Sequence, residues 1–106
     1  MRFNRRNWNK YFDGSNKVTT IRLHSTPCGH KKAWAGSYTK PELLGEFDLV
    51  SVTQTFYGKL TEEDAKNDGF KSLKELQAEL TKLNGKVKDT QEVFIHHTVN
   101  VKRTQK

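Results

Sequence analysis

The chain has 106 residues, enough for one domain with a single modest hydrophobic core. Apolar residues make up 33% and charged residues 29%, and no apolar run approaches the ~18 residues that a membrane-spanning helix needs. The basic first twelve residues lack the apolar stretch of a signal peptide, and the single cysteine, Cys28, excludes an intramolecular disulfide, so we expect a cytoplasmic protein.

The net charge of +7 is unevenly distributed along the chain. Residues 1–40 contain nine lysines and arginines against one acid, whereas residues 41–106 contain ten against eleven. One interpretation is an accidental bias on a solvated surface. The other is a surface that faces a polyanion, because clustered basic side chains gain affinity by releasing phosphate counterions. The second interpretation predicts a polyanionic partner.

The first part of the chain predicts a short helix, a strand and a long connection. Trp8, Tyr11 and Phe12 have the spacing of one helical face. Residues 16–24 are rich in β-branched side chains and predict a strand. Residues 25–45 are rich in turn-forming residues, so we expect an irregular connection there.

The next segments predict a strand followed by a helix. Residues 46–58 alternate as a strand, and the alternation changes register near Leu49, which indicates a β-bulge or a change of face. Thr61 has the position of a helix N-cap before a run of acids, and Asp68 with Gly69 gives the stop signal.

The last third of the chain predicts a second helix and a final strand. Ser72 and Glu75 match a capping box at the start of this helix. Its apolar face consists of leucines that need a sheet to cover: Leu73, Leu76, Leu80 and Leu83. Residues 92–103 alternate as a strand, which places His97 on the apolar face as an interior residue. His96, on the other face, is then the better candidate to line a cleft.

Strands separated by long connections, with two helices placed together late in the chain, predict an α+β fold. The strands are too few for a sandwich, so we expect a small, partly closed β-barrel flanked by short helices. No repeat or linker divides the sequence. We therefore expect residues 1–106 to form one domain, with residues 103–106 as a frayed tail.

Two segments of the sequence resemble the ASCH domains, which belong to the PUA-like superfamily. The stretch GSNKVTTIR is similar to their G-x-K-x-x-T-x-R signature, with Lys17, Thr20 and Arg22 at the matching spacing. Residues 60–76 resemble a second characteristic piece, in which a Leu-Thr-acid segment leads through an alanine to an acid–glycine pair and a leucine-bearing helix. The order of elements also agrees over nearly the whole chain.

The resemblance implies a PUA-like mixed β-barrel that binds RNA or a nucleotide-like ligand in a cleft between the signature strand and the acidic helix. The implied cleft residues are Lys17, Thr20, Arg22 and Asp68, with Arg22 holding an anionic or carbonyl group. The chain also resembles the small bacterial acetylcytidine amidohydrolases. That branch implies Thr20 as nucleophile, Lys17 as its base and Asp68 as acid/base partner, acting on N4-acetylcytidine or a related nucleoside. A further implied role is a protein-interaction module of a transcription or translation complex.

Three features of the sequence bear on these implied roles. One extra residue separates Gly14 from Lys17, and Asp68 stands where glutamate is common. A threonine is a poor nucleophile unless a nearby base with a lowered pKa removes its proton. Lys17 and Thr20 lie on opposite faces of a regular strand, so they converge only if Lys17 precedes the strand. If Lys17 does not precede the strand, the site binds its ligand without hydrolysing it. The alternative to a cleft is a solvated strand face on which Arg22 pairs with an acid.

Aromatic residues between lysines suit nucleic acid, because bases stack on the rings while lysines meet phosphates. The same aromatics can instead pin their loop to the core. The candidate nucleic-acid-binding residues are Arg5, Arg6, Lys10, Lys31, Lys32, Trp34 and Tyr38. His24, Cys28 and His30 lack an evident fourth ligand and match no common zinc spacing, so we expect no metal and no cofactor. We also expect a monomer that does not engage membranes.

Overall fold

The computed structural model describes residues 1–104, which form an α+β domain, as predicted. The helices are α1 (Arg5–Asn9), α2 (Glu62–Asn67) and α3 (Leu73–Asn84), with a short 3-10 turn η1 (Tyr57–Lys59). The strands are β1 (Thr19–Arg22), β2 (Gly29–Gly36), β3 (Pro41–Phe56) and β4 (Glu92–Arg103). Within this range no helix is long and apolar enough to cross a membrane.

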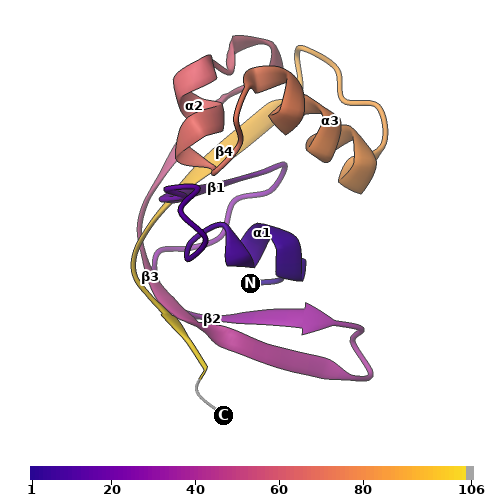
Figure 1. Cartoon of the computed structure of the whole chain (residues 1–106). Coiled ribbons are helices and arrows are strands. Elements are labelled where there is room, and N and C mark those ends of the chain that lie inside the picture. Colours follow the sequence, from indigo (N-terminus) through magenta and orange to yellow (C-terminus); the bar gives the residue numbers. More distant parts are fainter. Residues whose placement is uncertain (105–106) are drawn as a thin grey trace.

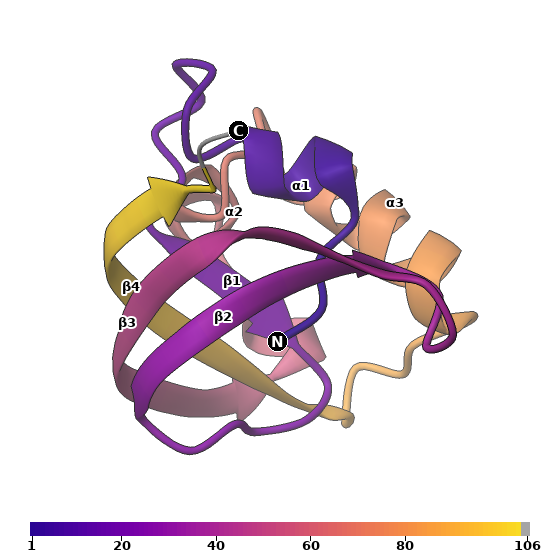
Figure 2. The same ribbon diagram turned by 90° about the horizontal axis from the view of Figure 1, so that it is seen from below.

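The four strands form one antiparallel sheet in the order β1-β4-β3-β2. The sheet is strongly curved, and α1 lies on its concave side (Figure 1). Helices α2 and α3 pack together at the end of the sheet that contains β1 (Figure 1, Figure 2). Over residues 1–104 no pairing joins β1 to β2, so the sheet is open and these two strands are its edges.

The hydrophobic core consists of two clusters. The upper cluster lies beneath α2 and α3 and includes Ile21, Ala65, Phe70, Leu76, Leu80, Val93 and Ile95. The lower cluster joins α1 to β2 and β3 and includes Phe3, Trp8, Ala33, Ala35, Leu44, Phe47 and Leu49. Edge-to-face aromatic contacts, such as Phe3 against Trp8 with ring centroids 5.2 Å apart, stabilise the lower one.

The expectation of an irregular connection over residues 25–45 is wrong, because part of this segment forms strand β2. It pairs with β3 from Gly29↔Leu49 to Gly36↔Pro41. Its inner face is built from Ala33 and Ala35, which are 0% and 6% exposed. Alanine is a weak strand former and turn residues surround these two, so the period-two pattern was hidden in the sequence.

Strands β3 and β4 are joined with two irregularities. The register shifts between Leu49 and Ser51, leaving Val50 as the extra residue, and this confirms the predicted β-bulge. At the second shift, between Glu46 and Asp48 of β3, the one extra residue lies on β4, where Asn100 has a φ of +53°. Its side-chain amide donates to Asp48 Oδ2 at 2.9 Å, which stabilises the unusual backbone conformation.

The predicted helix boundaries follow their capping signals. Thr61 and Asp64 form a reciprocal capping box at the start of α2, and Gly69 follows its end with a φ of +84°. The Ser72 hydroxyl accepts from the first turn of α3. The predicted leucine stripe is covered over only part of its length. Leu83 is 55% exposed and lines the cavity described below.

The two histidines of β4 are placed opposite to the expectation. His96 is fully buried, whereas His97 is half-buried and bonds to the Thr53 hydroxyl at 3.0 Å. The reason is tertiary, because the loop after β1 folds over His96 and the backbone N–H of Thr26 donates to its Nε2 at 3.1 Å. No alternation pattern within β4 contains that information.

The end of the chain was expected to be frayed from residue 103. Arg103 is the last residue of β4 and pairs with Gly45. The backbone N–H of Thr104 donates to the carbonyl of Leu44 at 2.9 Å. Residues 105–106 lie outside the described part of the chain.

Candidate functional site

A cavity of about 400 Å³ opens between β1 and α3 and is lined by members of both hydrophobic clusters. The four cleft residues implied by the resemblance all line it: Lys17, Thr20, Arg22 and Asp68. The opposite wall is the leucine face of α3, formed by Leu76, Leu80 and Leu83. No residue of α2 itself lines the cavity, but its C-cap, Asp68, and the nearby Phe70 do.

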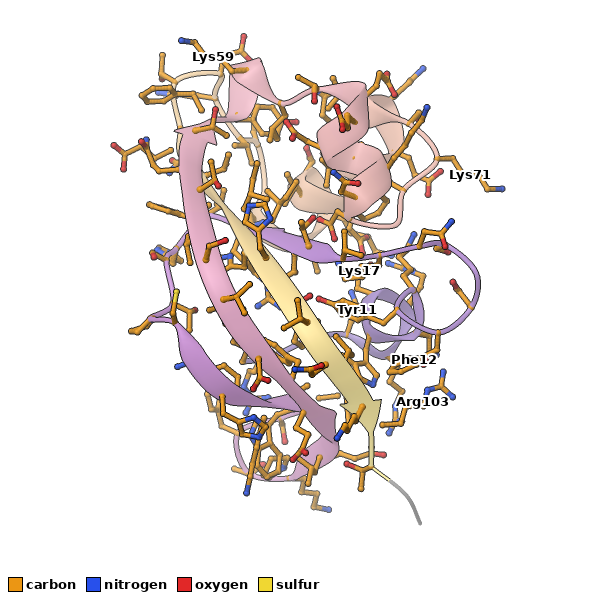
Figure 3. The ribbon with its side chains drawn as sticks, turned by 90° about the vertical axis from the view of Figure 1, so that its left-hand side faces the viewer. Tyr11, Phe12, Lys17, Lys59, Lys71 and Arg103 are labelled. Atoms are coloured by element: carbon orange, nitrogen blue, oxygen red, sulfur yellow. The ribbon has the colours of Figure 1, made fainter. Side chains whose placement is uncertain are left out.

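Lys17 lies two residues before β1 and directly follows Asn16, which has a φ of +58°. Its ammonium group is buried and donates to the carbonyl of Thr19 at 2.7 Å, to the carbonyl of Asp68 at 3.3 Å and to the Asp68 carboxylate. The Tyr11 ring centroid is 5.2 Å from Nζ, and Figure 3 shows the two side chains together. The three N–H donors of the ammonium are therefore all engaged.

Asp68 closes α2 and contacts β1 at the same time. Its Oδ2 accepts from the backbone N–H of Ile21 at 3.2 Å, while its other oxygen accepts from Lys17. Burial raises the pKa of Asp68 and lowers the pKa of Lys17, and their mutual attraction opposes both shifts. The residue after Asp68 must be glycine. Gly69 has a positive φ, and a Cβ there would lie 3.1 Å from the Cβ of Lys17.

Thr20 and Arg22 point from β1 into the cavity. The Thr20 hydroxyl accepts from Arg22 Nε at 3.3 Å, and the guanidinium carbon lies 4.6 Å from the centroid of the Phe3 ring. The two terminal NH₂ groups of Arg22 have no hydrogen-bond partner among residues 1–104. These donors are consequently available to a molecule in the cavity.

The relation between Lys17 and Thr20 is different from the one that hydrolysis needs. Lys17 does precede the strand, so the alternation of a regular strand does not keep its side chain apart from that of Thr20. Nevertheless the ammonium turns toward Asp68, and across the described chain no hydrogen bond joins it to the Thr20 hydroxyl. In this arrangement Lys17 is a structural cation and has no lone pair to accept a proton.

Glu79 of α3 is a cavity residue that sequence reasoning missed. Its carboxylate accepts from Arg6 at 2.8 and 3.0 Å, from Asn7 at 2.8 Å and from Asn4 at 3.4 Å. Burial raises the pKa of Glu79, but these donors outweigh it and hold the pKa below its usual value. This acid lies within the leucine stripe, on the apolar face of the helix, whereas an amphipathic surface helix is expected to carry its acids on the opposite, solvated face. That position was the signal in the sequence.

His96 lies on β4 beside Thr20 of the neighbouring strand β1 and supports the site from outside the cavity. Its Nδ1 donates to the carbonyl of Thr20 at 3.1 Å, while Nε2 accepts from Thr26, so the ring is neutral. Burial lowers the pKa of His96, and the nearby charge of Arg22 adds to this shift. The imidazole therefore fixes the Thr20 backbone and does not line the cavity, contrary to the expected cleft role.

The candidate nucleic-acid residues around α1 are engaged within the protein. Arg5 and Arg6 form ion pairs with glutamates, and Lys10 donates to the carbonyl of Gly69 at 3.0 Å. These contacts tie α1 to β3, to α3 and to the turn after α2. Because of these contacts, the three cations are less available to a phosphate group than basic side chains on a solvated helix.

The candidate residues of the β2–β3 hairpin are divided between two faces. Strand alternation places Lys31 on the inner face, whereas Lys32 and the half-buried Trp34 lie on the outer face. Tyr38, in the turn between the strands, is 88% exposed. The Arg2 guanidinium lies 3.9 Å above the centre of its ring.

The three residues with metal-ligand chemistry do not gather. His24 and Cys28 are exposed, and His30 bonds through Nδ1 to Asp48 at 2.9 Å. Between residues 1 and 104 no group of three or more potential ligand side chains is positioned to hold a metal ion.

No protein-family model, no curated protein and no solved structure matches this chain. The relation to ASCH domains therefore stays a prediction from the two sequence motifs.

Proposed function

We propose that this domain binds a nucleotide-like ligand in the cavity between β1 and α3. The observation that carries this proposal is that the two NH₂ groups of Arg22, beside an apolar wall, have no partner within residues 1–104. A guanidinium fork matches the oxygens of a phosphate, and a leucine surface matches the face of a nucleobase. The volume of about 400 Å³ lies within the range of roughly 300–1,000 Å³ typical of small-molecule sites.

Under this proposal the buried pair of Lys17 and Asp68 organises the site and does not react. It joins the segment before β1 to the end of α2, and Asp68 also holds the backbone of Ile21. Thr20 and Arg22, the neighbours of Ile21 in β1, are thereby held in position before a ligand arrives. Such preorganisation reduces the entropy cost of binding.

We further propose that the chain is an ASCH-type domain whose curved sheet is a PUA-like barrel left open between β1 and β2. The N-terminal segment supports this, because it lies between these two edges (Figure 2). The N–H of Phe3 donates to the carbonyl of Trp34 on β2 at 2.8 Å, and the Phe3 ring contacts Arg22 of β1. Residues 1–3 thus partly bridge the gap that a closed barrel would seal.

Calorimetric titration with the four ribonucleoside 5′-monophosphates and their nucleosides tests the binding proposal. We expect one monophosphate to bind, and Arg22→Gln to weaken it at least tenfold while the nucleoside is affected less. Arg103→Gln is the matched control, because Arg103 also lies over a phenylalanine ring, that of Phe12, outside the cavity (Figure 3). Absence of binding, or equal losses in the two variants, would refute the proposal.

Amidohydrolysis of an acylated cytidine is the second candidate function. The observation in its favour is that Lys17, Thr20 and Asp68 line one cavity, with burial shifting the pKa of Lys17 and of Asp68 toward the neutral pair. A neutral Lys17 would be able to accept the Thr20 proton. Release of cytidine from N4-acetylcytidine, lost in Thr20→Val with the fold intact, would support it. No release at high enzyme concentration would exclude it for this substrate.

A further inference from the structure

Arg2 lies on the boundary between two hollows of the surface. It lines the cavity between β1 and α3, and it also lines a second hollow of about 360 Å³ on the β2–β3 hairpin. The walls of this hairpin hollow are Met1, Arg2, Trp34, Tyr38 and Pro41. Since one side chain belongs to both walls, the two hollows are adjacent.

The hairpin hollow presents an aromatic ring with a cation behind it. The Arg2 guanidinium covers one face of Tyr38 and is itself held by the carbonyl of Gly36. At 88% exposure the other face of the Tyr38 ring is open to solvent. A fixed and exposed aromatic ring of this kind is the element on which single-stranded bases stack, whatever their sequence.

Positive charge connects the two hollows. The amino group of Met1 has a lowered pKa, first because of burial and then because of Arg22, Lys31 and Arg2. These three side-chain cations therefore lie near the amino group of Met1, a residue that lines the hairpin hollow. The acid on this part of β3, Glu42, already forms an ion pair with Arg5. A chain of phosphates running from Arg22 to Tyr38 would meet cations along its course.

We propose that the ligand is one nucleotide within a single strand of nucleic acid, whose neighbouring nucleotide stacks on Tyr38. This inference rests on the proposed function and narrows it from a free nucleotide to a strand. The cavity takes one nucleotide, Arg2 and Lys31 meet the connecting phosphates, and the hairpin takes the next base.

The test compares the best-binding monophosphate with a pentanucleotide that carries the same base at its centre, as RNA and as the matching DNA. We expect at least one of the two strands to bind at least tenfold tighter than the monophosphate. Tyr38→Ala should remove that gain and leave the affinity for the monophosphate unchanged, while Tyr38→Phe should retain the gain. Phe56→Ala is the matched control, because Phe56 is a partly exposed ring with Lys59 5.8 Å from its centroid on another part of the surface.

Strands that bind no tighter than the monophosphate would overturn the inference, and so would a full gain in Tyr38→Ala. Either result leaves monophosphate binding and its dependence on Arg22 intact, so the proposed function would stand. The inference would also be overturned if Phe56→Ala removed the tighter binding of the strand as Tyr38→Ala does. The tighter binding would then not depend specifically on the hairpin.

Discussion

The ammonium group of Lys17 donates to both the side-chain carboxylate and the backbone carbonyl of Asp68, and both residues are almost completely buried. The pair connects the segment before β1 to the end of α2, between the two hydrophobic clusters. The fold thus brings together two residues that lie 51 positions apart in the sequence. It also places charge next to a cavity that a ligand can enter.

Breaking this pair on one side should be strongly destabilising. Lys17→Met and Asp68→Asn should each lower the free energy of unfolding by about 3–5 kcal/mol, because each leaves a buried polar partner unsatisfied. The double variant should lose clearly less than the sum of the two. Urea unfolding of the four proteins gives the coupling energy, with Arg5→Met as control, since its exposed pair with Glu42 should contribute ~1 kcal/mol or less. Additive losses within about 0.5 kcal/mol would show that the two side chains do not interact.

Stability should fall as the pH decreases below about 6.5, the usual pKa of an unfolded histidine. His96 is buried as the neutral ring and its pKa is lowered, so the unfolded chain binds more protons in this range. The slope should be at most about 1.4 kcal/mol per pH unit and should flatten in His96→Gln. His30→Gln should not flatten it, because hydrogen bonding to Asp48 raises the pKa of His30 and gives the opposite sign. Urea unfolding at pH 7, 6 and 5 measures this, and an unchanged slope in His96→Gln would refute it.

Gly45→Ala should disrupt the pairing of β3 with β4. A Cβ at this position would lie 2.0 Å from the carbonyl oxygen of Lys102 and 2.7 Å from the Trp8 ring. Because both are fixed by the sheet and the lower cluster, we expect a loss of about 3 kcal/mol or more in thermal or urea unfolding. A Cβ at Gly14 meets no atom of the described residues within 4 Å, so Gly14→Ala should cost only the ~1–2 kcal/mol of its positive φ. Equal losses at the two positions would contradict this account of the β3–β4 contact.

Glu79→Gln should loosen α1 from α3. The carboxylate accepts hydrogen bonds from Arg6, Asn7 and Asn4, and its pKa is lowered, so its contribution is present above about pH 4.3 and is lost as the pH falls further. At pH 7 we expect a loss of about 1–3 kcal/mol and faster amide hydrogen exchange in α1. Glu75→Gln, at a more exposed position 3.7 Å from Lys10, is the control and should change exchange little. Unchanged protection of α1 in Glu79→Gln would refute the proposed clamp.

Features set by local backbone chemistry could be predicted from the sequence. The N-caps Thr61 and Ser72 are correct because a side-chain oxygen satisfies the nearest free N–H groups of its own helix. Gly69 is correct because only glycine adopts its backbone conformation at low cost. The bulge at Val50 is correct because the hydrophobic alternation itself changes there.

Features set by distant contacts could not be predicted in this way. Strand β2 was missed because its inner face consists of alanines, and His96 was misplaced because a loop from another part of the chain covers it. The candidate cleft residues line one cavity, but its second wall belongs to α3, and the Lys17 ammonium donates to Asp68 and not to the Thr20 hydroxyl. Side-chain direction in a buried polar cluster depends on all of its partners at once, and a motif names only some of them.

The most direct test of the central claim is chemical-shift mapping of the isotope-labelled protein with the four ribonucleoside 5′-monophosphates. The account predicts saturable shifts for backbone amides on both walls of the cavity, at Thr20, Arg22 and Leu80, caused by one of the four ligands. It predicts no shifts at Gly58, which lies outside the cavity. Shifts that are absent, or that saturate only at residues outside the cavity, would contradict a nucleotide site between β1 and α3.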